Sequence, residues 1–210
     1  MLFRSIIILL IFYRIISLAE GNKKLNSISE INITIIGNGK QQILSSSDGG
    51  FHSSNVFNSL PTQILVNGFL QNNISKYVYN LINQTNIITM RWNEQLTDCH
   101  SMFKELNNII SIDLSNFDAS KVENFDCMLY NCYNLKSINL NNLNTSSALN
   151  MAGMFDLCSS LETLNLSSFD TSKVTSMRNM FWGCTSLKSL DLSSFYTPKQ
   201  IGRASCRERV

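Results

Sequence analysis

The 210-residue sequence is poor in histidine and in charge. It contains two His, and charged residues make up 15 % of the chain, whereas proteins usually carry about 25 %. Imidazole chemistry and histidine metal sites therefore have few candidates. Neutral polar residues take the place of charge, above all 26 Asn and 29 Ser. Because 44 % of the residues are hydrophobic, a packed core is expected and wholesale disorder is not.

Both ends of the chain have features that do not belong to a folded domain. Residues 1–19 have the features of a secretory signal peptide, with Arg4 before an apolar stretch and Ser17-Leu18-Ala19 as a cleavage site. An uncleaved membrane anchor is the alternative, although the apolar run is short for about 30 Å of hydrocarbon. Residues 200–210 back-translate to a common sequencing adapter, so we expect an artefact that truncates a longer natural protein.

The charge balance argues against a nucleic-acid partner. Without the two end segments, 12 Lys and Arg stand against 14 Asp and Glu. A nucleic-acid binder needs a basic face to neutralise phosphates, so no nucleic acid is expected. A membrane is expected to be reached only through the leader or through a C-terminal anchor lost with the truncation.

A 26-residue repeat organises the second half of the chain. Related segments begin at Ser111, Ser137, Thr163 and Ser189, at a constant spacing of 26. Each unit contains Leu-x-x-Leu-x-Leu, the strand signature of leucine-rich repeats, whose units are about 20–29 residues long. The pattern predicts a β-rich solenoid over residues 91–199, in which a leucine-rich-repeat-like right-handed stack of coils forms a parallel sheet. Its leucines would point inward and the residues between them outward.

Residues 20–90 predict a small β-region before the array. Alternating apolar residues and turn signals indicate strands at 31–36, 77–81 and 87–92, and a strand with a turn at 62–68. We expect this region to cap the N-terminal edge of the array. A separate sandwich-like domain is the alternative.

The outward face of the predicted parallel sheet is the candidate binding surface. One row along it is acidic or amide and a neighbouring row carries hydroxyls: Asp113, Asn139, Asn165 and Asp191, with Ser137, Thr163 and Ser189. Stacked repeats present extended surfaces of the kind used for binding, and small polar side chains suit hydrogen bonds to a protein or a glycan. The alternative is that these rows only keep the surface soluble.

No catalytic or metal-binding set is found in the sequence. Asp113 and Asp191 would lie about 15 Å apart at ~4.8 Å per strand, too far for the ~5–9.5 Å of paired-carboxylate hydrolysis. There is no Gly-x-Ser-x-Gly elbow. The spacing of Cys99-His100 and of Cys127 from Cys132 fits no closed zinc site. We expect a protein that is not an enzyme and has no metal or cofactor.

The cysteines predict buried thiols and at most one disulfide. Cys132, Cys158 and Cys184 fall on one position of the repeat, and we expect them to form a reduced ladder in the core. Cys99 and Cys127 lie outside this ladder and are the one candidate pair for a bridge, across the first coil.

The repeat resembles the 26-residue surface-protein repeat of the BspA-like leucine-rich class. The likeness covers roughly residues 96–199 and rests on these motifs: Met154-Phe155-x-x-Cys158, Leu161-x-x-Leu164-x-Leu166, Phe169-Asp170-Thr171-Ser172 and Val174. Members of that class are generally secreted or anchored at the cell surface, and several are implicated in adhesion. The resemblance therefore implies an extracellular leucine-rich-repeat protein that binds a protein or glycan. A structural stalk or coat component with no ligand on the array is the alternative.

Overall fold

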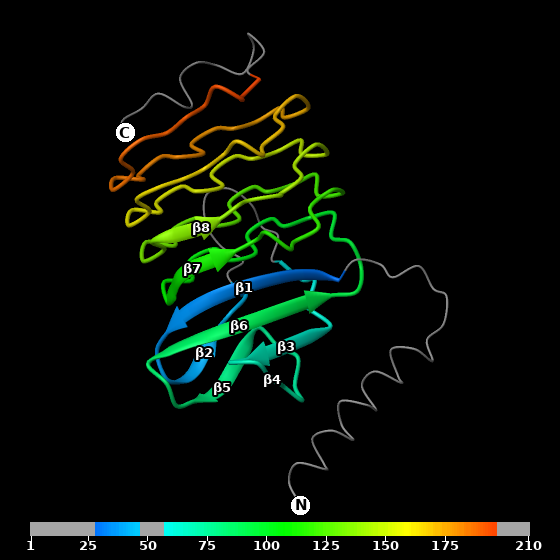
Figure 1. Cartoon of the computed structure of the whole chain (residues 1–210), viewed down its shortest axis with the longest axis vertical. Helices are drawn as coiled ribbons and strands as arrows, with labels where there is room; N and C mark the ends of the chain where they lie inside the picture. The colour runs from blue at the N-terminus through cyan, green and yellow to red at the C-terminus, as the bar shows by residue number, and fades with distance from the viewer. Residues whose placement is uncertain (1–27, 47–56, 197–210) are drawn as a thin grey trace, which may run out of the picture.

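The structure is a computed structural model that describes residues 28–46 and 57–196 (Figure 1). The predicted signal peptide and the predicted adapter tail lie outside these residues. The described part of the chain contains eight strands and no helix. The strands are β1 (Ser29–Ile36), β2 (Gly39–Gln42), β3 (Gln63–Val66), β4 (Phe69–Leu70), β5 (Tyr77–Leu81), β6 (Thr85–Trp92), β7 (Ile109–Asp113) and β8 (Ser137–Asn139). Accordingly, none of the described residues form a helix long and apolar enough to cross a membrane.

The predicted solenoid with its parallel sheet is wrong. The main sheet is a mixed sheet of six strands in the order β4-β3-β6-β1-β7-β8, and β2 and β5 form a second, antiparallel pair. Among these eight strands only β7 and β8 pair in parallel, through Ser111–Asp113 and Ser137–Asn139. Isolated parallel bridges outside the strands join Asp98 to Asn124, Asn124 to Asn150 and Asn150 to Ser176. The corresponding leucine motifs at 161–166 and 187–192 are not strands, so the expected right-handed leucine-rich-repeat-like coil stack has no continuous parallel sheet to support it.

The leucine motifs do not form a continuous parallel sheet because successive repeats are hydrogen-bonded mainly through other segments. We call residues 109–114, 135–140, 161–166 and 187–192 the leucine segments, and residues 99–105, 125–131, 151–157 and 177–183 the ladder segments. Within each of the first three ladder segments, every second N–H donates to the carbonyl 25 residues later, at 2.7–3.0 Å. After β8, one backbone hydrogen bond joins the described leucine segments: the Lys188 N–H donates to the Glu162 carbonyl of the preceding repeat. Figure 1 shows the repeats following one another along the long axis of the molecule.

The ladder segments have an unusual backbone conformation. Each contains two residues with φ between +54° and +73°, four positions apart, at Ser101 and Glu105, Cys127 and Asn131, Gly153 and Leu157, and Asn179 and Gly183. The N–H groups of a ladder segment alternate in direction. Those of Ser101 and Phe103 donate to the next repeat, whereas those of Met102 and Lys104 donate to carbonyls three residues earlier, at 3.2 Å.

Asp and Asn side chains close the turns of every repeat. The Oδ1 atom accepts a hydrogen bond from the backbone N–H two residues later at Asp98, Asn124 and Asn150, at Asp113, Asn139, Asn165 and Asp191, and at Asp118, Asn144 and Asp170. These are Asx turns, which offer the backbone an alternative to a sheet ladder. Those at Asp113, Asn139, Asn165 and Asp191 lie at the ends of the leucine segments, β7 and β8 included, and the asparagine turns account for part of the surplus of asparagine.

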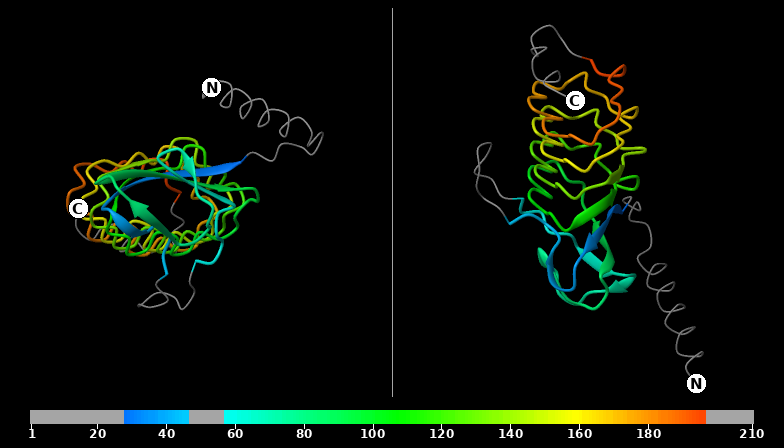
Figure 2. Two further views of the ribbon diagram at one scale, coloured as in Figure 1. Left: turned by 90° about the horizontal axis from the view of Figure 1, so that it is seen from below. Right: turned by 90° about the vertical axis from the view of Figure 1, so that its left-hand side faces the viewer.

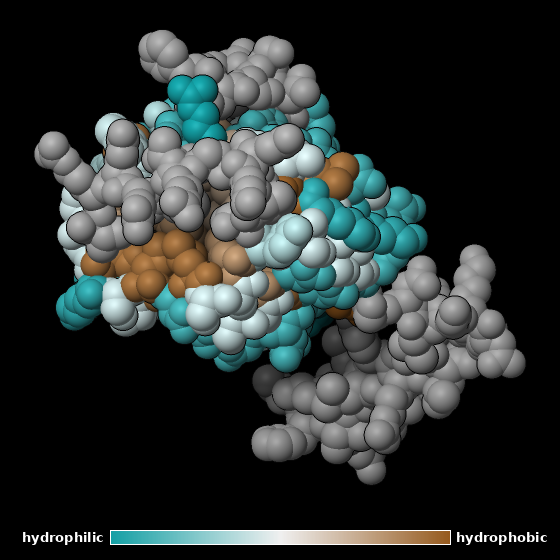
Figure 3. Space-filling model, turned by 90° about the horizontal axis from the view of Figure 1, so that it is seen from above, coloured by the Kyte–Doolittle hydropathy of each residue, from teal (hydrophilic) through white to brown (hydrophobic). Residues whose placement is uncertain are grey.

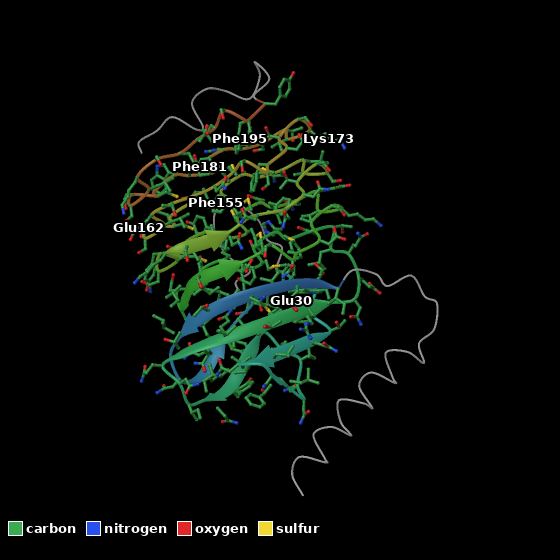
Figure 4. The ribbon with its side chains drawn as sticks, in the orientation of Figure 1. Glu30, Phe155, Glu162, Lys173, Phe181 and Phe195 are labelled. Atoms are coloured by element: carbon green, nitrogen blue, oxygen red, sulfur yellow. The ribbon has the colours of Figure 1, made fainter. Side chains whose placement is uncertain are left out.

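The interior of the repeats is filled by leucine, methionine, phenylalanine and cysteine. Leu161, Leu164 and Leu166 are buried, and Thr163 and Asn165 between them are exposed, as the alternation predicts. The rings of Phe155 and Phe181 stack with centroids 5.8 Å apart (Figure 4). Seen along the long axis in Figure 2, the repeats overlie one another around this common core.

The β-region before the repeats contains all four predicted strands, as β1, β3, β5 and β6. β2 and β4 were not predicted. In β1, Ile31, Ile33 and Ile35 are buried, which confirms the alternating pattern. β1 pairs antiparallel with both β6 and β7, so this region and the first repeat share one sheet.

Candidate functional site

The acidic and amide row of the leucine segments lies on the surface, but its side-chain oxygens are already engaged. Each of Asp113, Asn139, Asn165 and Asp191 forms one of the Asx turns described above, with Oδ1 2.9–3.1 Å from the backbone nitrogen. Asn139 also donates Nδ2–H to Asp113 Oδ1 at 3.0 Å. The bonds from the Ser193 backbone and hydroxyl lower the pKa of Asp191. The side chains of this row therefore form the turns that end the leucine segments.

The hydroxyl row beside it is available for a ligand. Ser137, Thr163 and Ser189 are exposed, and the structure gives their hydroxyls no hydrogen-bond partner among residues 28–46 and 57–196. Ser137 lies opposite Ser111 in the β7–β8 pair. Each free hydroxyl can donate one hydrogen bond and accept two.

A charged row that the sequence analysis did not single out flanks these hydroxyls. Lys188 Nζ lies 2.6 Å from Glu162 Oε2, and the hydrogen bond from Lys188, with a smaller contribution from Lys136, lowers the pKa of Glu162. Figure 4 places Glu162 at the rim of the array, away from the stacked phenylalanines. The constant spacing of Lys136, Glu162 and Lys188 was the signal that could have found this row.

A buried polar cluster on the ladder segments was also missed. Ser101 Oγ lies 3.1 Å from His100 Nε2, and His100 Nδ1 lies 3.6 Å from Asp126 Oδ2. The sequence analysis found no nucleophile–base set, although His100 and Asp126 occupy equivalent positions of adjacent repeats. The order of contacts is that of a hydrolytic triad, but Ser101 and His100 are 2 % and 4 % exposed, so the hydroxyl does not face solvent.

Asp156 is a further buried carboxyl group of the ladder segments, on the third repeat. Its carboxylate is 2 % exposed, and among the described residues its Oδ1 has no hydrogen-bond partner. Burial raises the pKa of Asp156 to about 6. The neighbouring Cys127 donates its S–H to Asp126 Oδ1 at 3.3 Å, and burial raises its pKa to about 12. A thiol with so high a pKa is a poor nucleophile.

The cysteines of the described residues are free and buried. The structure records both Cys99 and Cys127 as free thiols and does not join them as a bridge. Cys132, Cys158 and Cys184 form a reduced row in the core, each donating its S–H to a backbone carbonyl 29 residues earlier at 3.0–3.3 Å. Residues 28–46 and 57–196 contain no group of three or more His, Cys, Asp or Glu placed to hold a metal ion.

The C-terminal end of the described array presents apolar side chains. Leu190, Leu192 and Phe195 pack against the core and remain partly exposed. Figure 3, seen from this end, shows apolar atoms gathered inside a more hydrophilic rim.

Comparison with known proteins gives one match. A model of the family described as "Mycoplasma protein of unknown function, DUF285" matches residues 97–205, which is just over half of the chain. Nothing among curated proteins matches. Nothing among solved structures matches either.

Proposed function

Because the chain belongs to this family, whose function is unknown, we propose a function from the surface alone: a non-catalytic, secreted or cell-surface protein that binds an extracellular protein or glycan through its leucine segments. The observation that supports it is the exposed hydroxyl row of Ser137, Thr163 and Ser189, which has no hydrogen-bond partner within the described part of the chain. These groups recur in register beside Glu162 and Lys188, so that uncharged donors and acceptors alternate with charges along one face. Such a face can form several parallel hydrogen bonds to an extended ligand.

Adhesion is the role that fits this proposal. The repeat motif resembles that of the BspA-like leucine-rich class, and this resemblance supports extracellular display and contact with another surface. Hydroxyl-rich, weakly charged faces give little electrostatic steering. Affinity would thus come from many modest contacts along the array rather than from one charged anchor.

The experiment compares two triple variants on the same probes. S137A/T163A/S189A removes the free hydroxyls, whereas S172A/T175A/T185A removes three exposed hydroxyls that lie outside the leucine segments. The full chain and both variants are applied to immobilised glycans and to immobilised fibronectin, laminin and collagen. We expect the first variant to lose at least about tenfold in affinity, since each lost hydrogen bond contributes about 0.5–1.5 kcal/mol. Equal binding by all three proteins would contradict the proposal.

A structural stalk or coat component is the second candidate. It is favoured by the regularity of the ladder segments, whose hydrogen bonds continue through all four repeats without interruption. Such a component needs no ligand on its exposed face. Absence of binding to every probe, together with an elongated monomer in solution scattering, would favour this candidate over the first.

A further inference from the structure

Bulky apolar side chains are exposed on the β-region that precedes the repeats. Phe69, Leu70 and Ile82 lie at its end remote from the repeats, whereas the Ile36 N–H donates to the Asn108 carbonyl of the first repeat at 2.8 Å. The exposed fractions are 40 % for Ile36, 76 % for Phe69, 57 % for Leu70, 91 % for Ile82 and 53 % for Ile87. We call these five residues the turn-tip cluster. β3, β4 and β5 lie at this end, opposite the last repeat (Figures 1 and 2).

One buried asparagine ties the turns of this cluster together. Asn86 donates Nδ2–H to the carbonyls of Gly37 and Asn83, at 3.2 and 2.8 Å. Its Oδ1 accepts a hydrogen bond from Asn67 Nδ2 at 3.0 Å, and Asn67 Oδ1 in turn accepts the N–H of Ile87 at 2.9 Å. The turns after β1, β3 and β5 are thus fixed to one another, and Ile36, Phe69 and Ile82 are held as neighbours of these bonded residues.

The turn that carries Phe69 is itself rigid. Asn67 and Gly68 have φ of +50° and +85°, as the two central residues of a type I′ hairpin require. The hairpin places Val66 opposite Phe69 in the β3–β4 pair. Paired residues share one face of an antiparallel ladder. Val66 is buried on that face, whereas Phe69 lies on the edge strand β4 and is exposed, so the ring extends beyond the buried part of the face.

The shape of the cluster favours a lipid surface over a protein partner. A protein interface needs a flat or complementary surface, and its core is close-packed. Here the most exposed side chains are Phe69, in the two-residue edge strand β4, and Ile82, directly after β5. Protruding apolar side chains can enter the fluid headgroup region of a bilayer without a matching surface, and large exposed apolar patches mark interaction sites.

The charge distribution also favours an anionic lipid surface. Residues 28–93 contain three bases and two acids, and one of these acids, Glu30, pairs with Arg91 at 2.7 Å, whereas residues 94–196 contain six bases and eleven acids. Lys40 is the second residue of β2, the strand that follows the Gly37 turn, and its ammonium lies 4.2 Å from the centroid of Tyr77 and 5.5 Å from that of Tyr79. An ammonium held beside two aromatic rings is typical of side chains at the membrane–water interface.

We propose that the turn-tip cluster docks this end of the protein on an anionic lipid bilayer. Phe69, Leu70 and Ile82 enter the interface, Lys40 contacts lipid phosphates, and the acidic repeats project away from the membrane. The leucine segments then stay accessible to a ligand. This proposal does not depend on the binding function proposed above, because lipid and ligand engage different regions.

The test measures membrane contact at a defined residue of the full chain. The variants Ile82→Trp and Tyr133→Trp place a fluorophore in the cluster and on an exposed position of the second repeat. Vesicles of phosphatidylcholine and phosphatidylglycerol at 7:3 are added, with pure phosphatidylcholine for comparison. We expect the emission of Ile82→Trp to shift to shorter wavelength with the anionic vesicles and that of Tyr133→Trp to stay constant.

A second pair of variants measures the strength of binding. F69S/I82S removes two apolar tips, and Y133S/L149S removes two exposed apolar side chains from the repeats. Both share residues 1–27 with the parent, so any contribution of the leader is equal. We expect F69S/I82S to lower sedimentation with anionic vesicles at least about tenfold and Y133S/L149S to leave it unchanged.

Two results would overturn the proposal. One is a constant Ile82→Trp spectrum with vesicles, which also decides the matter if F69S/I82S does not fold. The other is a blue shift that depends on protein concentration and not on lipid, which would assign the cluster to association between copies of the chain.

Discussion

The leucine segment and the ladder segment, which recur in each repeat, hold the molecule together in different ways. The leucine segments supply apolar side chains to the core, and their backbone is turned by Asx bonds within the same repeat. The ladder segments supply the hydrogen bonds between repeats, through twelve N–H groups that each reach the next repeat. The periodic apolar pattern of the leucine segments therefore identifies their buried face. The backbone hydrogen bonds that join one repeat to the next lie mainly in the ladder segments.

Hydrogen exchange tests this comparison most directly, and the expected effect is large. Amides of Leu129, Phe155 and Leu157 donate to the following repeat, whereas Thr163 and Asn165 are exposed and belong to no strand. After correction for intrinsic rates, we expect the first three to exchange at least about 100-fold more slowly. Equal protection of both groups would mean that the leucine segments also join the repeats.

A methyl group added to Gly183 should weaken the ladder. Gly183 has φ of +73°, and a Cβ there would lie 2.7 Å from Leu157 Cδ2 and 3.3 Å from Leu157 Cα. We expect Gly183→Ala to lower the free energy of unfolding by about 2–3 kcal/mol, through backbone strain and contact with the preceding repeat. The measurement is urea unfolding.

Gly39 provides the matched control. Its φ is +68°, but a Cβ there meets nothing within 4 Å. Gly39→Ala should therefore cost only the backbone term, about 1 kcal/mol. If both variants lose the same amount, close approach of the ladder segments does not contribute.

The buried Asp156 should make the ladder side sensitive to pH. Its pKa is raised by burial to about 6, so the protonated form is the one that folding favours. The stabilisation is present at acidic pH and is lost as the pH rises through about 6. Between pH 4.5 and 7.5, we expect the parent to lose about 2 kcal/mol of unfolding free energy relative to Asp156→Asn.

Asp170→Asn is the control for that titration. Asp170 is exposed, and hydrogen bonds from Ser172 lower its pKa, so the substitution should not remove the loss of stability near pH 6. Unfolding midpoints of the three proteins at four pH values suffice. A parent and an Asp156→Asn variant with parallel pH profiles would contradict the role assigned to this carboxylate.

Loss of one Asx turn should have the smallest effect. Asn165 Oδ1 accepts the Ser167 N–H at 3.0 Å on an exposed part of the third repeat. Asn165→Ala should lower the unfolding free energy by about 0.5–1 kcal/mol, and Thr163→Ala, which removes a hydroxyl without a structural partner, by less. Differences in thermal unfolding would resolve the two. A larger loss for Thr163→Ala would argue against the division between a structural row and a free row.

The sequence predicted burial well and hydrogen bonding poorly. The period of 26 and the alternation of leucine correctly assigned Leu161, Leu164 and Leu166 to the core. The same motif led to a parallel sheet that the structure lacks beyond β8, because alternation fixes which side chains are buried and not which backbone groups pair. Aspartate or asparagine two residues before a serine was visible in the repeats and could have predicted the Asx turns.

The ladder conformation could not have been predicted from residue type. Its left-handed positions are occupied by Ser101, Cys127 and Leu157 as well as by glycine and asparagine. Non-glycine residues seldom adopt positive φ, so composition gave no signal. Contacts between repeats impose this geometry, as they also bring His100 to Asp126.

The one-way orientation of the ladder gives the array a polarity like that of a filament with unequal ends. Each ladder segment offers amide donors to its successor and carbonyl acceptors to its predecessor, and in the first ladder segment the Met102 carbonyl accepts the N–H of Ser45. A unit inserted backwards would set donors against donors. Engineered versions can therefore be lengthened only head to tail. A designed cap before the first ladder segment must supply N–H donors, and a cap after the last must supply carbonyl acceptors.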